Sequence, residues 1–152
     1  MKKLFAIVLS FALLMSLSVT AFAANTTGGD ADITTSIAPT YTVTIPADVN
    51  VTFNATETAF GTIEVTASQI HPDKCIKVAL ATDKELNNAI DNTKVIPYAI
   101  KDSEGVEFNS ATYLTEGDKT ELSIHITADD WNAAYAGDYS DTVTFTVSYE
   151  DK

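Results

Sequence analysis

The stretch that decides the fold is "AGDYSDTVTFTVSYEDK", which runs from Ala136 to Lys152. Apolar and polar residues alternate through most of it, a pattern typical of a strand with one buried and one solvated face. One face carries Val143, Phe145, Val147 and Tyr149, and the other carries Thr142, Thr144, Thr146 and Ser148. The pattern predicts a core strand and leaves open whether its edge pairs within this chain or with another subunit.

The same period of two recurs along the rest of the chain. The Thr, Val and Ile residues of these runs favour a pleated, half-buried surface, and residues 49–54 continue in an extended pattern. We expect seven to nine short strands in an all-β, antiparallel, immunoglobulin-like β-sandwich, with a small β-barrel as the alternative. The clearest runs lie at 40–46, 60–66, 75–81, 94–100 and 120–127.

One stretch departs from the strand pattern. Residues 128–138, "ADDWNAAYAGD", contain several good helix formers and lack the alternation of their neighbours. They predict a short helical turn with Asp129 or Asp130 as its N-cap and Gly137 at its end.

The first residues have the features of a targeting segment. Two lysines precede a long apolar run, and the run is followed by the small-x-small pattern Ala21-Phe22-Ala23. These features predict a secretory signal peptide over residues 1–23, with an uncleaved membrane anchor as the alternative. A flexible N-terminal lead is then expected at 24–32 and the sandwich domain at 33–152. The protein is therefore predicted to be secreted, at a bacterial cell surface.

The composition is strongly acidic. The chain has 21 Asp and Glu against nine Lys and Arg, with no arginine, and its formal net charge is −12. Such a surface repels phosphate and anionic headgroups, which argues against nucleic acid and, after signal cleavage, against a membrane as partners. Cys75 is the single cysteine, so an internal disulfide is excluded. We interpret it as a small apolar group in a strand, with interchain pairing or a reactive thiol as alternatives.

No constellation in the sequence indicates catalysis. His71 lies in a predicted turn, and His125 lies on the polar face of a predicted strand. Neither has the spacing of a zinc helix, and no motif joins them to a nucleophile. The acidic turns do not match the EF-hand loop, and no pair of carboxylates is singled out for hydrolysis. We therefore expect no catalytic residues, no metal, no cofactor and no enzymatic activity.

An aromatic cluster precedes the strand quoted above. It consists of Trp131, Tyr135 and Tyr139. Exposed aromatic side chains stack on sugars or anchor protein partners, which makes these three a candidate ligand contact. The interpretation we prefer for Trp131 is that it plugs one end of the sandwich.

The segment Ala136–Tyr149, "AGDYSDTVTFTVSY", resembles the C-terminal strand of bacterial fimbrial subunits and of the spore coat U-like family of secreted proteins. The stretch "YTVTIPADV" at 41–49 is similar to the opening of small secreted immunoglobulin-like proteins. Fimbrial subunits of the chaperone–usher type usually carry a disulfide, and this chain has one cysteine. The resemblance thus extends to the architecture more directly than to the route of assembly.

What the resemblance implies is pairing between subunits by strand donation, in which an extended segment completes a neighbour's sheet. The candidate donor strand is Ala31, Ile33, Thr35 and Ile37, and the candidate acceptor strand is Val143, Phe145, Val147 and Tyr149. The alternative is that residues 31–37 form the first strand of their own domain.

Two functions follow as hypotheses. The first is a secreted cell-surface structural protein, either a fimbria-like or pilin-like subunit or an adhesion domain, whose partners are further copies or other surface subunits. The second is an extracellular module that binds an unidentified carbohydrate or protein through the cluster near Trp131.

Overall fold

The computed structural model describes residues 30–152, so the predicted signal peptide and most of the predicted lead lie outside the described residues. Within this range the chain forms ten strands and one short helix. The strands are β1 (Thr40–Thr44), β2 (Glu57–Gln69), β3 (Lys74–Ala81), β4 (Glu85–Asn88), β5 (Val95–Pro97), β6 (Ala99–Asp102), β7 (Ser110–Tyr113), β8 (Lys119–His125), β9 (Tyr139–Ser140) and β10 (Thr144–Asp151), and the helix is α1 (Ala128–Ala133).

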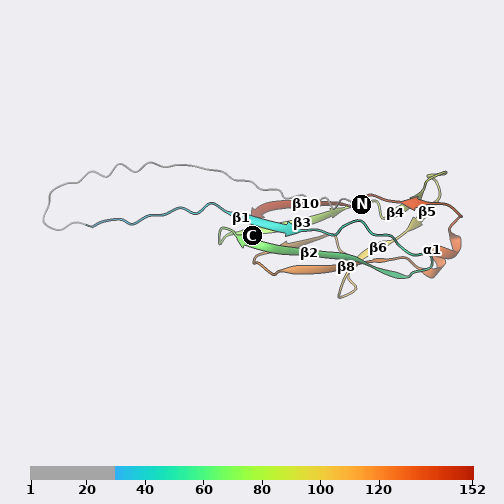
Figure 1. The fold of residues 1–152 in the computed structure, drawn as a ribbon, viewed down its shortest axis with the longest axis horizontal. Helices are drawn as coiled ribbons and strands as arrows, with labels where there is room; N and C mark the ends of the chain where they lie inside the picture. Colours follow the sequence, from blue (N-terminus) through green and yellow to red (C-terminus); the bar gives the residue numbers. More distant parts are fainter. Residues whose placement is uncertain (1–29) are drawn as a thin grey trace, which may run out of the picture.

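The strands pair into three antiparallel sheets, with orders β1-β2-β8-β6, β10-β3-β7 and β5-β4-β9. The first two sheets pack face to face along the molecule, and the small third sheet lies with α1 at one end (Figure 1). These sheets are open, so the expected all-β antiparallel sandwich is confirmed and the barrel alternative is wrong. The strand count exceeds the predicted seven to nine because the third sheet is built from very short strands.

The core lies between the two larger sheets and follows from the alternation in the sequence. Every second residue of the central strands faces inward, so the β-branched residues of these strands end up on one face. Two tyrosines, Phe108 and Trp131 extend the same cluster toward the ends of the sandwich. Its fully buried aliphatic members are Ile63, Val65, Ile76, Val78, Ile96, Ile100 and Ile126.

The strand order of the larger sheets is immunoglobulin-like. The order β1-β2-β8-β6 matches the A-B-E-D sheet of such sandwiches, with β3 and β10 in the places of strands C and F. Figure 1 shows that β1 begins, and β10 ends, at the end of the sandwich opposite α1. We call the end where β1 begins the base.

The caps of α1 differ from the prediction. Thr127 is the N-cap, and its hydroxyl accepts a hydrogen bond from the backbone N–H of Asp130 at 3.1 Å. Asp129 and Asp130 instead occupy the first turn, where carboxylates favour the positive end of the helix. Ala134, rather than Gly137, follows the last helical residue, because the backbone turns extended there.

The N-terminal boundary of the sandwich also differs from the prediction. The first strand begins at Thr40 rather than near residue 33, and residues 49–54 form no strand. Residues 31–37 form no strand either, so the alternative that they open their own domain is wrong. Among the described residues, no helix is long and apolar enough to cross a bilayer.

Candidate functional site

The outer edge of β10 is the first component of the candidate site. β10 pairs with β3 over its whole length, from Thr144 opposite Ala81 to Asp151 opposite Lys74. No strand of residues 30–152 pairs with the other edge of β10. In an immunoglobulin-like sandwich that position, beside strand F, belongs to strand G. This edge therefore presents a row of backbone N–H and C=O groups to which a further strand can bond.

Val147 shows that the interior is open along this edge. Its partner across the ladder is Val78, so both side chains lie on the core face of the sheet. Val78 is 0% exposed, yet Val147 is 36% exposed. An inward-facing valine keeps that much exposure only where no further strand covers it. The prediction that Val147 faces the core is thus correct, but its side chain is less buried than a core strand implies.

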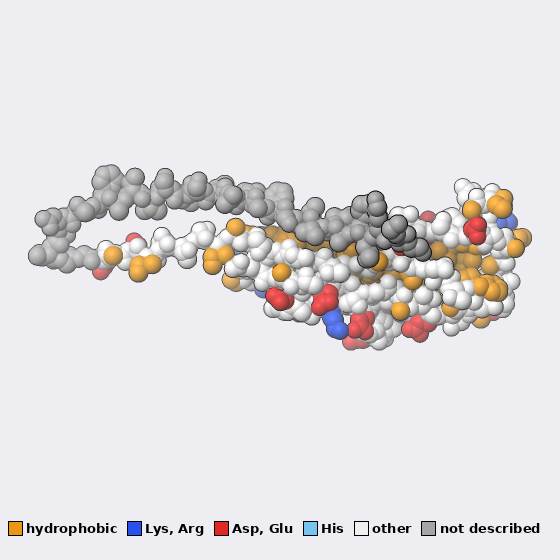
Figure 2. Space-filling view, viewed as in Figure 1, with side chains coloured by type: hydrophobic (Ala, Val, Ile, Leu, Met, Phe, Trp, Pro, Cys, Tyr) orange, Lys and Arg blue, Asp and Glu red, His pale blue; other side chains and the backbone are white. Residues whose placement is uncertain are grey.

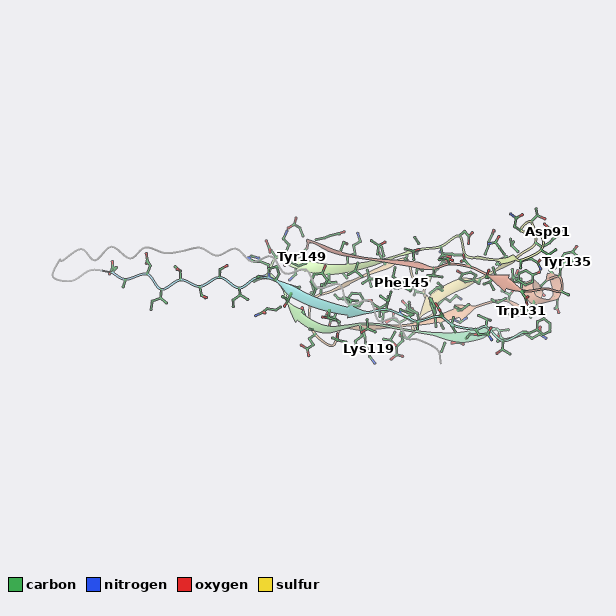
Figure 3. All side chains as sticks on the ribbon, turned by 45° about the horizontal axis from the view of Figure 1, so that its top comes forward. Asp91, Lys119, Trp131, Tyr135, Phe145 and Tyr149 are labelled. Atoms are coloured by element: carbon green, nitrogen blue, oxygen red, sulfur yellow. The ribbon has the colours of Figure 1, made fainter. Side chains whose placement is uncertain are left out.

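Aromatic pairs hold the two sheets together on either side of Val147. The rings of Tyr41 and Tyr149 stack with centroids 5.8 Å apart near the base, and those of Phe60 and Phe145 lie 5.9 Å apart farther along. Figure 3 shows Tyr149 and Phe145 spaced along β10 in this way. We call the strip that these five residues line, between the edges of the two sheets, the seam. All five are apolar enough to receive apolar side chains of an added strand.

A second row of unpaired backbone continues from β1. Residues 45–51 form no backbone–backbone hydrogen bond with any described residue. This stretch runs on toward the α1 end of the molecule (Figure 1). It leaves β2 where Pro46 packs over Gly61, since a Cβ atom at Gly61 would lie 3.0 Å from the Pro46 Cβ. The side chains of Ile45 and Val49 are 43% and 37% exposed.

The candidate donor segment lies outside the sandwich. Ala31, Ile33, Thr35 and Ile37 are all exposed, with Ile33 at 99% and Ile37 at 67%. Figure 1 shows this segment extending away from the base, with no element of the described chain beside it. The structure therefore does not bring donor and acceptor residues together within one chain.

The aromatic cluster does not form a single contact surface. Trp131 is 9% exposed, and its indole N–H donates to the carbonyl of Ala55 at 2.8 Å. The edge of Phe53 packs against it, with centroids 5.5 Å apart. Trp131 thus closes the end of the sandwich, as the preferred interpretation predicted, and it does not point outward to a ligand.

The two tyrosines of the cluster lie nearer the surface. Tyr135 is 63% exposed and has the Lys94 ammonium 4.9 Å from its ring centroid. The Tyr139 hydroxyl donates to the carbonyl of Tyr135 at 3.0 Å and accepts from its backbone N–H at 3.2 Å. Tyr139 therefore holds the loop after α1, and Tyr135 alone of the three has a widely exposed ring.

A half-buried polar cluster joins the end of β3 to the loop before β10. The carboxylate of Asp141 accepts hydrogen bonds from the hydroxyls of Tyr98 and Thr82 and from the backbone N–H of Thr142. Burial acts to raise the pKa of Asp141, but these three donors together lower it below its ordinary value. Burial, together with the Asp141 carboxylate, raises the pKa of Tyr98. The cluster is a structural clamp, since its polar atoms satisfy one another.

The two histidines lie in different parts of the sandwich, and each contacts a side chain two residues away. His71 contacts Asp73 in the turn between β2 and β3, and this hydrogen bond lowers the pKa of Asp73. The His125 imidazole is 2.9 Å from the Ser123 hydroxyl on the outer face of β8, but no carboxylate of residues 30–152 hydrogen-bonds to its ring. No group of three or more His, Cys, Asp or Glu side chains within residues 30–152 is placed to hold a metal ion. Cys75 is buried in β3.

Sequence reasoning missed three parts of the candidate site. Tyr41 and Phe60 are indistinguishable from ordinary core residues in the sequence, and the unpaired backbone at 45–51 depends on which strand lies beside it. Pro46 was the available signal, because a proline that ends a strand also removes a ladder donor.

Comparison with protein-family models finds no match for this chain, and comparison with curated proteins also finds none.

Proposed function

We propose that this protein is a secreted structural subunit of a bacterial cell surface, whose copies join by strand donation. In this scheme residues 31–37 of one copy pair with the outer edge of β10 in the next copy. The observation that carries the proposal is Val147, a core-facing side chain that is 36% exposed beside an unpaired strand edge. An incomplete sheet and an exposed extended segment in the same chain are the two halves that this mode of recognition requires.

Chemical complementarity supports the pairing. Alternate residues of the donor segment share one face, which places Ile33 and Ile37 on the side that would enter the seam. The seam offers aromatic rings and Val147 to receive them. Burying each isoleucine contributes about 1.5–3 kcal/mol, in addition to the main-chain hydrogen bonds along the edge of β10.

For a donor strand antiparallel to β10, the length of the linker requires a second copy. β10 runs toward the base, so a strand antiparallel to it must run away from the base. Its last residue, Ile37, would then lie near Thr144, about 20 Å from the base at the rise of a strand. Only Ala38 and Pro39 join Ile37 to β1, which starts at the base, and they span about 7 Å. A chain therefore cannot place its own segment antiparallel to its own β10.

A peptide-binding experiment tests the proposal. The acceptor is the chain from Pro39 to Lys152, which keeps the sandwich because residues 30–38 make no hydrogen bond with it. A synthetic peptide of residues 30–38 should bind this acceptor in calorimetry and raise its melting temperature. The control peptide carries Ile33→Asp and Ile37→Asp and should not bind. Equal binding of both peptides, or of neither, would contradict strand donation.

Self-association of the longer chain gives a second test. The chain from Ala24 to Lys152 should form oligomers in size-exclusion chromatography and elongated particles in electron microscopy. The chain from Pro39 should remain a monomer at the same concentration. If the two chains elute alike, the polymer version of the function fails.

The second hypothesis, a binding module that uses the aromatic cluster, has less support. Trp131 is buried and hydrogen-bonded, so only the exposed ring of Tyr135 is free to stack on a ligand. A glycan array with a Tyr135→Ala control tests what remains of this hypothesis.

A further inference from the structure

We infer a second contact between neighbouring copies, formed by three exposed apolar side chains of the acceptor: Ile45, Val49 and Phe53. We call these three residues the shoulder. The inference rests on the proposed strand donation and goes beyond it, because it assigns a surface outside the seam to the body of the donor rather than to its extended segment.

The first step concerns the short linker. Once Ile37 is paired with the acceptor, only Ala38 and Pro39 separate it from β1 of the donor. Two extended residues span about 7 Å. The folded body of the donor must therefore lie directly against the acceptor, because this linker leaves no space for an intervening layer of solvent.

The second step concerns direction. Every strand pair in the described chain is antiparallel, and antiparallel pairing is slightly more stable per residue than parallel pairing. Because β10 runs from Thr144 toward the base, an antiparallel donor strand ends near Thr144. The body of the donor then meets the half of the acceptor that carries α1 and the third sheet, and it does not meet the acceptor's base.

The third step concerns what that half exposes beside the seam. Phe53 is 71% exposed even though its edge packs on Trp131, and Ile45 and Val49 are 43% and 37% exposed. All three belong to the stretch between β1 and β2 that lacks backbone pairing over residues 45–51. Hydrophobic side chains also gather at this end of the molecule in Figure 2. The described chain thus leaves part of each of these three side chains exposed.

The base of the donor offers a matching side chain. Leu114 is 43% exposed, and its carbonyl accepts a hydrogen bond from the Ser68 hydroxyl. Ser68 lies opposite Tyr41, in the second residue pair of the β1–β2 ladder. Leu114 is therefore close to the point where the linker enters the donor. A contact between base and shoulder joins two different surfaces, so each copy can offer one surface to the copy before it and the other to the copy after it.

A heterodimer assay isolates this contact. The acceptor is the chain from Pro39 to Lys152, which cannot donate, and the donor is the chain from Ala24 with Val147→Lys, which blocks its own seam. In the acceptor, Val49→Ser with Phe53→Ser removes two of the three apolar side chains of the shoulder. The matched control is Val106→Ser, since Val106 is 57% exposed in the loop between β6 and β7.

We expect the donor chain to bind the unmodified acceptor about tenfold more tightly than the peptide of residues 30–38 does. Loss of the shoulder should remove this difference and leave the peptide affinity unchanged, and Val106→Ser should change neither value. Equal affinities of chain and peptide for the unmodified acceptor would overturn the shoulder contact and leave strand donation intact. Failure of the peptide to bind at all would overturn both.

Discussion

At the scale of single residues, each end of the sandwich is filled by a large side chain that also makes a polar contact. Trp131 fills the α1 end and Tyr149 the base, and each also takes part in a hydrogen bond to the backbone of a distant segment. Such residues combine apolar burial with a specific polar contact. We therefore expect their substitution to destabilise the distant segment to which they hydrogen-bond as well as their own.

We predict that Trp131→Ala lowers the free energy of unfolding by about 3–5 kcal/mol, because it leaves a large cavity and an unpaired Ala55 carbonyl. Tyr135→Ala, only four residues away, should stay within about 0.5 kcal/mol of the unmodified protein because its ring is mostly exposed. Urea unfolding followed by circular dichroism measures both. Similar losses for the two variants would contradict the assignment of Trp131 as the plug.

The Asp141 clamp predicts a pH dependence of stability. The folded-state pKa of Asp141 lies below its ordinary value, so its stabilising effect is present above that ordinary value and is lost as the pH falls through the folded value. Asp141→Asn should therefore cost about 1–3 kcal/mol near neutral pH and progressively less below about pH 4. Urea midpoints at pH 7 and pH 3 test this.

Tyr98→Phe provides the matched control for the clamp, because it removes one donor to Asp141 and keeps the ring in place. It should reduce the same pH dependence in part. A deficit for Asp141→Asn that stays constant between the two pH values would show that the carboxylate charge is not what stabilises the loop.

At the scale of elements, β2 must accommodate both a bulge and the departure of the segment after β1. The β2–β8 register shifts between Ala59 and Gly61, and Gly61 has a φ of +139°. Pro46 packs directly over this glycine. The bulge thus sets where residues 45–51 leave the sheet and where the second row of unpaired backbone begins.

Gly61→Ala should destabilise the domain more than Gly105→Ala does. Both glycines have a positive φ, so both substitutions strain the backbone by about 1–3 kcal/mol. A Cβ atom at Gly105 meets nothing within 4 Å, whereas one at Gly61 lies 3.0 Å from Pro46 Cβ. Thermal unfolding of the two variants compares them. Equal decreases in melting temperature would mean that Pro46 can move away from the added Cβ atom at no cost in stability.

How far the sequence predicts the structure differs from one element to the next. Alternation predicted β3 and β10 because each has one face in the core, so side-chain type follows the environment. The same alternation at 49–54 was misleading, since period two reports which way side chains point and not whether a backbone partner exists. Val51 packs on the core, yet no strand pairs beside it within the described residues.

The candidate site was predictable only in part for the same physical reason. The donor and acceptor residues were predicted from the pattern and the resemblance, but the exposure of Val147 depends on a neighbour that the pattern of one strand does not encode. The cap of α1 is a smaller example. Thr127, Asp129 and Asp130 are all good caps, and only the backbone geometry selects Thr127.

At the scale of the whole molecule, the open seam leaves part of the core unfinished in each copy. The described sandwich has an exposed strand edge on one side and an exposed apolar segment at its base, both of which favour aggregation in an isolated monomer. The strand donation that we propose accounts for both features with one interaction, because in that scheme each subunit supplies what the next one lacks.

We predict that a single chain can be made to complete its own sandwich. β10 ends at the base with Asp151, so a copy of residues 31–38 joined after Lys152 through an Asn-Gly turn would form a hairpin antiparallel to β10. Added to the chain from Pro39, it should fill the seam, raise the urea midpoint and the melting temperature, and abolish binding of the peptide of residues 30–38. The same addition with aspartates at the two isoleucine positions should do none of these. A completed chain that is no more stable than this aspartate control would show that the seam does not require an apolar strand, and the exposure of Val147 would then need a different partner.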